Sequence, residues 1–437
     1  MGHSPWGLKE SGMTEQPSTA QHTTELTLNH ICKKSLTPLC SLLKVSSSSF
    51  SIWPHTTSLT DGSTKAFLHL INQVKKTGIE PLVILPNKQA LYQYLHAQQI
   101  PCVALRHGMR PATYPPYKTI ADKILFLPRL LGRLAINALA TIQSYMIVRR
   151  FHPDIIHTNT GVVSIGYHVA RWLHIPHVWH LREYGAWEFH TYPYPSLCAQ
   201  QKRFQKRNSY TIAITKALQQ YYGLEDISSS QVIYDGVMPA AAAAYESNKE
   251  KYLLFAGTFS DVKGILPLID AYAAYAKQCP AALPLWIAGA GPDNYTQKIK
   301  DKIGYYQLEN QIRLLGMRSD MDDLYKKATA LIVPSLFEGF GFITAEAMFN
   351  GCLVIGHDVA GTKEQFDNGK HLTGEEIALR YNTPEQLIQH LMQLTHATST
   401  TYEPMIQRGQ TTVMQLYTTE VHLQQILTLY NTIVSNK

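Results

Sequence analysis

Two glutamates, Glu338 and Glu346, stand in a segment that passes from strand signals to helix signals. The apolar run at 330–333 predicts a buried strand, and a helix is predicted from about Phe342 to Phe349, so Glu346 lies about one turn into that helix. Helical side chains tilt toward the N-terminus, which turns Glu346 toward the loop that carries Glu338. Ionised carboxylates only accept hydrogen bonds, and this suits the hydroxyls of a sugar and a ribose. From these residues alone the alternative stays open that both glutamates are solvated surface residues.

The loop before the predicted helix contains Gly339 and Gly341, which allow a ligand to approach the backbone closely. The helix N-terminus that follows carries unpaired N–H groups and about half a positive charge. A phosphate is the expected ligand of such a terminus. Phosphate-binding backbone beside hydroxyl-binding carboxylates predicts a site for a sugar nucleotide.

The order of residues in this segment resembles the E-x7-E signature of the retaining glycosyltransferase family 4, a family with the GT-B fold. The matching parts are an EGFG loop at 338–341, an EAM helix at 346–348, Gly351, and a turn that contains Gly361 and Glu364. The resemblance implies that Glu338 and the backbone N–H groups of Phe340, Gly341 and Phe342 hold the sugar. It implies that Glu346 holds the ribose, and it leaves the role of Glu364 open.

The resemblance extends to the loop at 257–264, where the family has an arginine and a lysine that bind the donor diphosphate. Lys263 and Gly264 are retained, but Thr258 stands where the arginine is expected. Electrostatic stabilisation of the departing diphosphate is the main catalytic effect available, so either another cation replaces the arginine or activity is low. The replacements that the sequence offers are Arg182, Arg318 and Lys363.

Three further residues of the N-terminal half are assigned by the same resemblance. Gly62 opens a helix and corresponds to a glycine loop that faces the donor diphosphate across a cleft. His180 lies in the strand predicted at 177–181 and corresponds to the histidine that contacts the transferred sugar, although the chain has 19 histidines and a structural role is the alternative. Arg182 either contacts phosphate or acceptor, or pairs with an acid such as Glu183.

Gly316 follows a predicted strand at which, in the resembled family, the backbone meets the nucleotide base. Asp320 and Asp322 imitate a metal-binding D-x-D motif. Because a helical pattern continues through Leu324, we interpret them as an acidic first helical turn capped near Ser319. No metal site is therefore predicted, and no cofactor other than the donor as co-substrate.

Strand and helix signals alternate along both halves of the chain, which is typical of doubly wound parallel sheets. We predict an α/β protein with the GT-B fold, in which two Rossmann-like domains face a cleft and a C-terminal helix crosses back to the first domain. The predicted parts are a disordered or non-core segment, an acceptor-side domain, a nucleotide-sugar domain and the crossover helix, at 1–45, 46–240, 241–415 and 416–437. The first of these lacks the basic start and apolar block of a secretory signal, and Met13 is an alternative start.

Charge is divided unevenly, with 24 basic and 14 acidic side chains in residues 1–250 and 15 against 18 in the remainder. Much of the excess lies in a predicted apolar helix, punctuated by Arg129, Arg133, Arg149 and Arg150. Its longest uncharged run, 134–148, is 15 residues, too short and too polar to span a bilayer. A basic amphipathic helix on an anionic membrane surface and a core helix with a solvated basic edge remain equally open.

The six cysteines are scattered without a C-x-x-C motif, which argues against a zinc knuckle or a disulfide framework and favours the cytoplasm. We expect a hexosyltransferase-type glycosyltransferase that moves a sugar from a nucleoside diphosphate sugar to a glycan or lipid-linked acceptor in cell-surface polysaccharide or glycoconjugate synthesis. Retention of configuration and independence of metal are expected, and nucleic acid is not an expected partner. The alternatives are a GT-B nucleotide-sugar epimerase and a catalytically weakened sugar-nucleotide-binding protein.

Overall fold

The computed structural model describes residues 49–54, 62–107, 119–185, 196–398 and 400–436. The chain divides into two units, residues 1–46 and 47–437, and all that follows concerns the second. The predicted segment at 1–45 lies outside the described residues.

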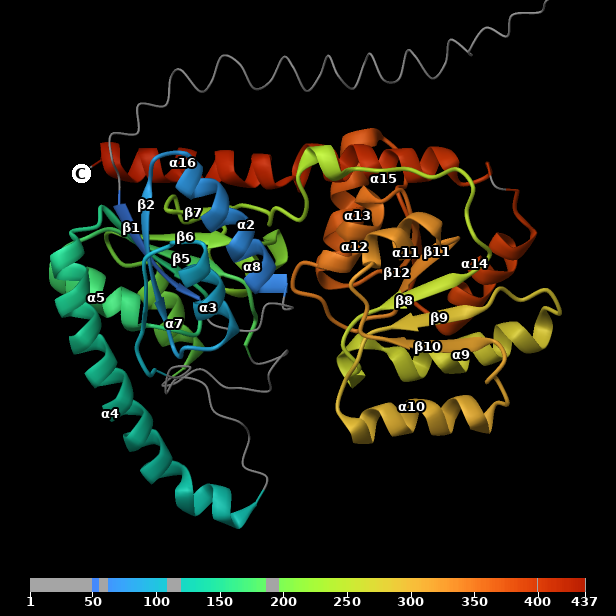
Figure 1. The fold of residues 1–437 in the computed structure, drawn as a ribbon, viewed down its shortest axis with the longest axis horizontal. Helices are drawn as coiled ribbons and strands as arrows, with labels where there is room; N and C mark the ends of the chain where they lie inside the picture. The colour runs from blue at the N-terminus through green and yellow to red at the C-terminus, as the bar shows by residue number, and fades with distance from the viewer. Residues whose placement is uncertain (1–48, 55–61, 108–118, 186–195, 399, 437) are drawn as a thin grey trace, which may run out of the picture. The chain divides into compact units, whose positions relative to one another are not determined.

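A parallel sheet of seven strands, ordered β3-β2-β1-β4-β5-β6-β7, organises the first half of this unit (Figure 1). Its elements are β1 (Ser49–Pro54), α2 (Gly62–Lys76), β2 (Glu80–Leu85), α3 (Ala90–Ala97), β3 (Cys102–Ala104), α4 (Ile120–Phe151), β4 (Ile155–Asn159), α5 (Ile165–Leu173), β5 (His177–Leu181), α7 (Leu197–Phe204), β6 (Ser209–Ala213), α8 (Lys216–Tyr221) and β7 (Ser230–Val232). The strand order reverses direction beside β1, as in doubly wound folds.

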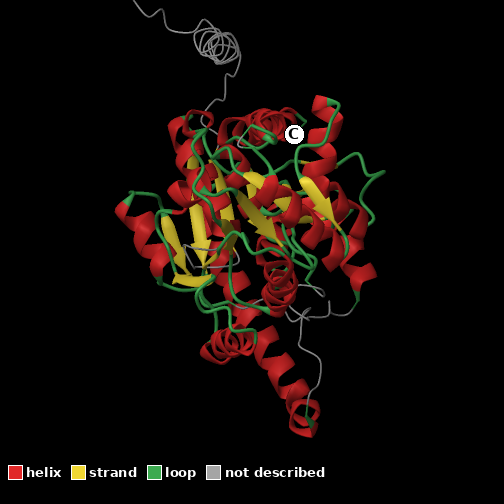
Figure 2. Ribbon diagram, turned by 90° about the vertical axis from the view of Figure 1, so that its right-hand side faces the viewer, coloured by secondary structure: helices red, strands yellow, loops and turns green. Residues whose placement is uncertain are grey.

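A second parallel sheet, of six strands in the order β10-β9-β8-β11-β12-β13, organises the other half. Its elements are η1 (Ala240–Ala242), β8 (Leu253–Ala256), η2 (Asp261–Lys263), α9 (Ile265–Gln278), β9 (Leu285–Ala288), α10 (Asp293–Tyr305), β10 (Ile312–Gly316), α11 (Met321–Lys327), β11 (Ala330–Val333), α12 (Phe342–Phe349), β12 (Leu353–His357), α13 (Ala360–Thr373), β13 (Leu379–Tyr381), α14 (Pro384–His396), α15 (Glu403–Leu416) and α16 (Thr419–Ser435). Helices accompany the strands of both sheets (Figure 2). The alternation predicted from the sequence is confirmed, and the predicted boundary near residue 240 falls in η1, between the two sheets.

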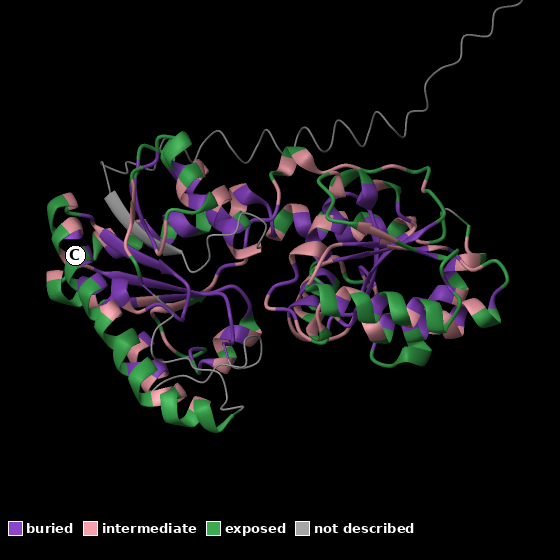
Figure 3. Cartoon of the chain, turned by 60° about the horizontal axis from the view of Figure 1, so that its bottom comes forward, coloured by how far each residue is buried: buried purple, intermediate pink, exposed green. Residues whose placement is uncertain are grey.

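The strands of the second sheet are apolar on both faces because helices cover both faces. Leu254 and Leu331 belong to one buried cluster, while their neighbours Leu253 and Ala330 belong to another. Successive side chains of a strand point to opposite faces, so one short apolar run supplies both cores. Figure 3 shows these strands in the colour of buried residues.

Helix α16 leaves the second sheet and packs on the first, as predicted. The Tyr430 hydroxyl lies 2.7 Å from His157 Nδ1 of β4, and His422 Nδ1 lies 2.7 Å from the Tyr234 carbonyl oxygen. A Cβ at Gly236 would lie 2.7 Å from the Thr419 backbone, so a glycine is required where the helix begins. The C-terminal helix is therefore built into the first half of the unit.

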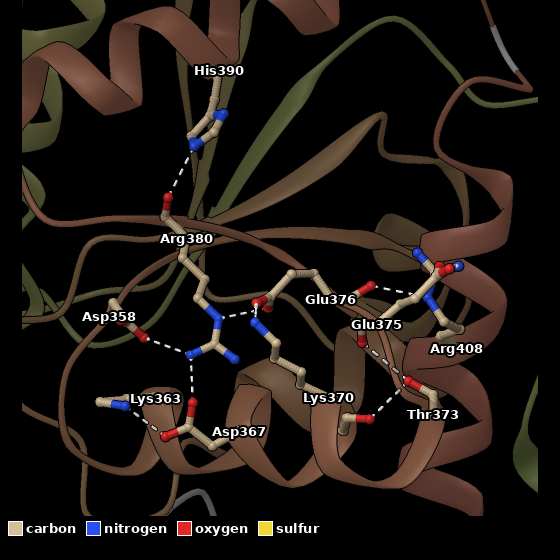
Figure 4. Close-up of polar contacts among 11 residues, drawn as sticks. Asp358, Lys363, Asp367, Lys370, Thr373, Glu375, Glu376, Arg380, His390 and Arg408 are labelled. Carbon is tan, nitrogen blue, oxygen red and sulfur yellow. Dashed lines mark hydrogen bonds and ion pairs between the residues drawn. The ribbon is translucent and has the colours of Figure 1, made fainter.

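An ion-pair network around Arg380 joins β13 to α13, the helix that carries Gly361 and Glu364 (Figure 4). The Arg380 guanidinium pairs with Asp358 at 3.1 Å, with Asp367 at 2.6 Å and with Glu376 at 2.8 Å. Only 17% of the Arg380 side chain is exposed, and its loss would leave three carboxylates close together, of which Asp358 is poorly exposed as well.

We expect Arg380→Ala to lower the free energy of unfolding by about 2 kcal/mol, because it removes the shared partner of three acids. Arg318→Ala is the matched control, since the Arg318 side chain is 40% exposed and pairs with Asp320 alone. That exposed pair is expected to contribute much less than the Arg380 network, because solvent screens it. Urea unfolding of both variants measures the difference, and equal losses would show that the network does not brace α13.

Candidate active site

Glu338 lies in the loop between β11 and α12, and Lys263 reaches it from the loop after β8. Glu338 Oε1 accepts hydrogen bonds from Lys263 Nζ at 2.6 Å and from Ser335 Oγ at 2.7 Å. Glu338 is 8% exposed, so the carboxylate is held in place by two partners near the surface of the fold. The structure thus brings together two residues that are 75 positions apart and that the sequence assigned to one site.

Gly264 explains how these two loops come so close. It has φ +68, and a Cβ there would lie 2.1 Å from the Pro334 carbonyl oxygen. Only glycine fits such a position. A backbone hydrogen bond of 2.8 Å from Leu336 N to Val262 O joins the same two loops and so positions the backbone of Lys263.

Glu346 lies on α12 and has two partners of its own. Glu346 Oε1 pairs with Lys65 Nζ at 3.0 Å, and Glu346 Oε2 accepts from the Tyr325 hydroxyl at 3.2 Å. Burial, and then the Glu346 charge, raise the pKa of Tyr325 well above its usual value, so this hydroxyl remains a donor. Lys65 is the more exposed partner, with 45% of its side chain accessible against 15% for Glu346.

Gly62 and Phe342, the first residues of α2 and α12, are in close contact. A Cβ at Gly62 would lie 2.9 Å from the Phe342 ring, which explains the small residue at this position. The first turn of α2 therefore meets the first turn of α12, where an anion is expected to bind. Lys65 was not predicted from the sequence as a site residue. The only indication in the sequence is its position one turn after Gly62.

The three cations offered as replacements for the arginine missing at Thr258 are each paired with an acid. Lys363 bonds Asp367 at 2.6 Å, and Arg318 pairs with Asp320. Arg182 is buried against Asp235, and its Nε donates to Asn159 Oδ1 at 2.9 Å. Thr258 itself is exposed. Within the part of the chain that the structure describes, the cation that reaches a motif glutamate besides Lys263 is Lys65.

His180 is fully buried at the end of β5 in a polar network with His157. Arg182 Nη2 and His157 Nε2 lie 3.5 and 3.3 Å from His180 Nδ1. An arginine can only donate, so His180 Nδ1 accepts, His157 Nε2 carries a hydrogen, and the other His157 nitrogen accepts from Tyr430. Burial, followed by the Arg182 charge, lowers the pKa of His180 well below its usual value and that of His157 to about 3. Contact of His180 with a transferred sugar stays a prediction.

The structure also explains Asp235. Asp235 is fully buried and is the ionic partner of Arg182. Of the two roles left open for Arg182, the described contacts show the pairing with an acid, and that acid is Asp235 rather than the neighbouring Glu183. Glu183 instead accepts from the Gly161 backbone at 2.9 Å.

Glu364 contacts the other sheet's helices. Its two carboxylate oxygens accept from the backbone N–H groups of Lys216 and Ala217 at 2.7 and 3.1 Å, and the Tyr234 hydroxyl donates to it at 3.0 Å. A carboxylate at the start of α8 is the favourable partner for unpaired N–H groups. In the structure Glu364 therefore joins the two halves of the unit.

The remaining predicted residues lie near the ends of strands. Gly316 ends β10 with φ +68, and its carbonyl accepts from Gly289 N at 2.8 Å. Helix α11 begins at Met321 with Asp320 as its N-cap, one residue after the predicted Ser319. Asp322 accepts from Asn350 at 3.2 Å. The described residues include no group of three potential metal ligands.

Comparison with known proteins defines the class of fold. Residues 250–397 match the family model described as Glycosyl transferases group 1. A crystal structure of Anabaena HepE in complex with UDP-glucose superposes with a TM-score of 0.68 at 19% identity, covering 89% of this chain and 100% of that one. A TarM variant of S. aureus in complex with fondaparinux, alpha-GlcNAc-glycerol and UDP gives 0.65 at 12% identity, covering 88% and 100%. Together with the two parallel sheets, these likenesses show the GT-B fold.

Two curated relatives match part of the chain. Over 121 residues it is 33% identical to a poly(glycerol-phosphate) alpha-glucosyltransferase of Bacillus subtilis (strain 168), covering 28% of this chain and 18% of the relative. Over 119 residues it is 30% identical to a trehalose synthase of Pyrococcus horikoshii, covering 26% and 29%. The matched part thus spans less than a third of either relative.

Proposed function

We propose that the protein is a retaining hexosyltransferase of glycosyltransferase family 4, which moves a sugar from a nucleoside diphosphate sugar to a glycan or lipid-linked acceptor. The family match, the GT-B fold and structural neighbours that were solved with UDP-glucose or UDP support this proposal. A cytoplasmic place in cell-surface polysaccharide or glycoconjugate synthesis is part of it, as is catalysis without a metal or a resident cofactor.

The observation that carries the proposal is the pairing of each motif glutamate with a lysine. Lys263 neutralises Glu338, and Lys65 neutralises Glu346. A sugar nucleotide can replace the partners in both ion pairs. Its diphosphate attracts both lysines, and its neutral hydroxyls donate hydrogen bonds to both carboxylates. The N-terminus of α12 between them adds backbone N–H donors for phosphate.

In the proposed reaction the bond between the anomeric carbon and the diphosphate oxygen breaks, and a bond to the acceptor oxygen forms on the same face. The acceptor proton passes to the departing phosphate oxygen. Lys263, Lys65 and the start of α12 stabilise the charge that develops on the diphosphate, which is where fixed cations contribute most. Glu338 orients the sugar and Glu346 the ribose, and no side chain acts as a covalent nucleophile.

A panel of sugar nucleotides, each with and without glycan and lipid-linked acceptors and with and without a chelator, tests this function. We expect acceptor-dependent release of nucleoside diphosphate that the chelator leaves unchanged. An altered donor sugar without acceptor would indicate an epimerase instead. Thr258 favours a second candidate, a sugar-nucleotide-binding protein with weak catalysis, for which donor would raise Tm without any release.

We further propose that Lys65 is the second cation of the donor site, in place of the arginine expected at Thr258. The lysine of the Lys65–Glu346 pair is nearly half exposed, and pairs with an exposed partner contribute about 1 kcal/mol or less, so a diphosphate can displace the carboxylate easily. The first turn of α2 contacts the first turn of α12, which places the Lys65 ammonium beside the expected phosphate position.

Lys65→Gln is therefore expected to lower kcat/KM by about 10²-fold, as for loss of one group that stabilises the transition state. Adding Thr258→Arg to this variant should restore part of the activity, which a purely structural role of Lys65 would not allow. Lys76→Gln, at an exposed position in the last turn of the same helix, is the matched control. Steady-state kinetics with the active donor measure all three, and an unchanged kcat/KM in Lys65→Gln would refute the assignment.

A further inference from the structure

Helix α4 extends past its neighbours and leaves most of its apolar surface in water. Its C-terminal part packs against α5 through Ala140, Ser144 and Val148, which are buried. Its N-terminal part continues away from this contact (Figure 1) and is coloured as exposed along most of its length (Figure 3). The core-helix interpretation therefore holds for the C-terminal part of α4, and the N-terminal part is exposed instead.

Six of the exposed apolar residues of α4 form one stripe. Spacings of three, four and eight residues place them on a single helical face: Ile120, Ile124, Leu127, Leu131, Leu134 and Ile142. Exposure of these side chains ranges from 41% to 77%. A continuous apolar face of this size is unusual on a soluble surface and marks a binding site.

The charges of α4 favour an anionic occupant. The helix carries Lys123, Arg129, Arg133, Arg149 and Arg150 against one acid, Asp122, which is already bonded to Arg129 at 3.1 Å. A second copy packed along the same stripe would add five more cations and one more acid, so it would lack the acid–base pairs that join coiled-coil helices. Residues 1–46 offer little compensation, because they contain four lysines and three glutamates.

We propose that the α4 stripe docks on an anionic phospholipid surface. By length and composition α4 could also cross a bilayer, since an 18-residue window has a mean hydropathy of 1.4 and is 17% buried. Its C-terminal part, however, packs on α5 through Thr141 and Ser144, and Arg129 and Arg133 interrupt its N-terminal part. A helix held in this way lies in the interface, with leucine and isoleucine among the acyl chains and the basic side chains at the headgroups.

Burial of the apolar stripe and attraction of the basic side chains to the lipid are the two contributions that stable peripheral binding requires. Leucine and isoleucine side chains that leave water and cations that approach an anionic leaflet both favour binding. The electrostatic part is screened by salt, whereas the apolar part is not. Binding is therefore expected to weaken with salt and to depend on both sets of side chains.

Co-sedimentation of the full chain with vesicles tests this surface. Wild type is expected to bind vesicles made of an equal mixture of phosphatidylglycerol and phosphatidylcholine. Its affinity for vesicles of phosphatidylcholine alone should be at least about tenfold lower. Ile124→Ser with Leu131→Ser should lower the affinity for the anionic vesicles at least about tenfold. The matched control is Met317→Ser with Leu372→Ser, which alters two exposed apolar residues outside α4 and should bind as wild type.

Sedimentation velocity without lipid tests whether a second copy of the chain occupies the stripe instead. A dimer that the α4 double variant disrupts would identify a second copy and overturn the proposal. The proposal would also be overturned if the α4 variant bound vesicles as tightly as wild type does. It would equally be overturned if wild type did not bind vesicles, as expected if residues 1–46 cover the stripe. The assay contains no donor or acceptor, so its outcome is independent of the proposed sugar transfer.

Discussion

Glu338→Gln is expected to reduce sugar transfer at least about 10²-fold while the fold is kept. The carboxylate accepts from Lys263 and Ser335, and in the proposed reaction it accepts from the donor's sugar hydroxyl. Glutamine has the same shape but no charge and only one acceptor oxygen, so it loses both the pairing with Lys263 and part of the hydroxyl contact. Losses of about 10²–10³ in kcat are usual when one preorganised polar group of an active site is removed.

The matched control is Glu309→Gln, which makes the same change at an exposed position. Both variants should keep a Tm near that of wild type, because the Lys263–Glu338 pair reaches the surface through a lysine that is 27% exposed. Initial rates of nucleoside diphosphate release measure the effect. If Glu338→Gln turns over within about twofold of the control, Glu338 does not hold the sugar.

The second large effect is a loss of stability in mild acid. His157, His177, His180 and His422 are buried, and burial, more than the neighbouring charges, lowers the pKa of each below its usual value of 6.5. In the unfolded chain these imidazoles regain ordinary pKa values, so below pH 6.5 the unfolded state binds more protons than the folded state. Stability is therefore full above pH 6.5 and is lost as the pH falls.

The expected loss is about 1 kcal/mol between pH 6.5 and about 5.5 for each of His157, His177 and His180, whose pKa values lie well below 6.5, or about 3 kcal/mol for the three, and His422 adds to it. A domain with a typical total stability of about 5–15 kcal/mol would lose a large part of it. The acidic residues affect stability in a lower pH range. Burial raises the pKa of Asp367, but hydrogen bonds from Lys363 and Arg380 outweigh burial and lower the net pKa, so this contribution is lost only as the pH falls below about 4.

Urea unfolding at a series of pH values measures this dependence. His177→Gln should make the slope between pH 6.5 and 5.5 shallower by about one proton, since His177 contacts the Thr158 hydroxyl and has no charged partner to lose. His371→Gln, at an exposed position, is the control. A wild-type stability that is constant from pH 7 to about 5 would contradict the buried, neutral state of these imidazoles.

The fold was largely predictable because its signals are local and repeat along the chain. The short apolar run 330–333 became a parallel strand, since covered sheets bury both faces of every strand. The contact between Glu338 and Lys263 also followed the prediction, because both loops leave the carboxyl ends of neighbouring parallel strands, β11 and β8.

Residues that act through long-range packing were harder to predict. Lys65 follows Gly62 by one turn, but only the contact between the first turns of α2 and α12 brings it to Glu346. His180 ends its strand as expected, yet helix α16 covers it with His422, whose ring stacks at 6.0 Å. Glu364 lies in a matching motif, but its partners are backbone N–H groups almost 150 residues earlier, at positions 216 and 217. Periodicity carries no information about such pairings.

The central claim is that one sugar nucleotide takes both lysines away from both glutamates. A crystal structure with the donor identified by the panel tests it most directly. We expect the diphosphate at the start of α12 with Lys263 and Lys65 on its oxygens, the ribose on Glu346 and the sugar on Glu338. A diphosphate bound elsewhere, or bound while Lys263 stays on Glu338 and Lys65 on Glu346, would contradict it.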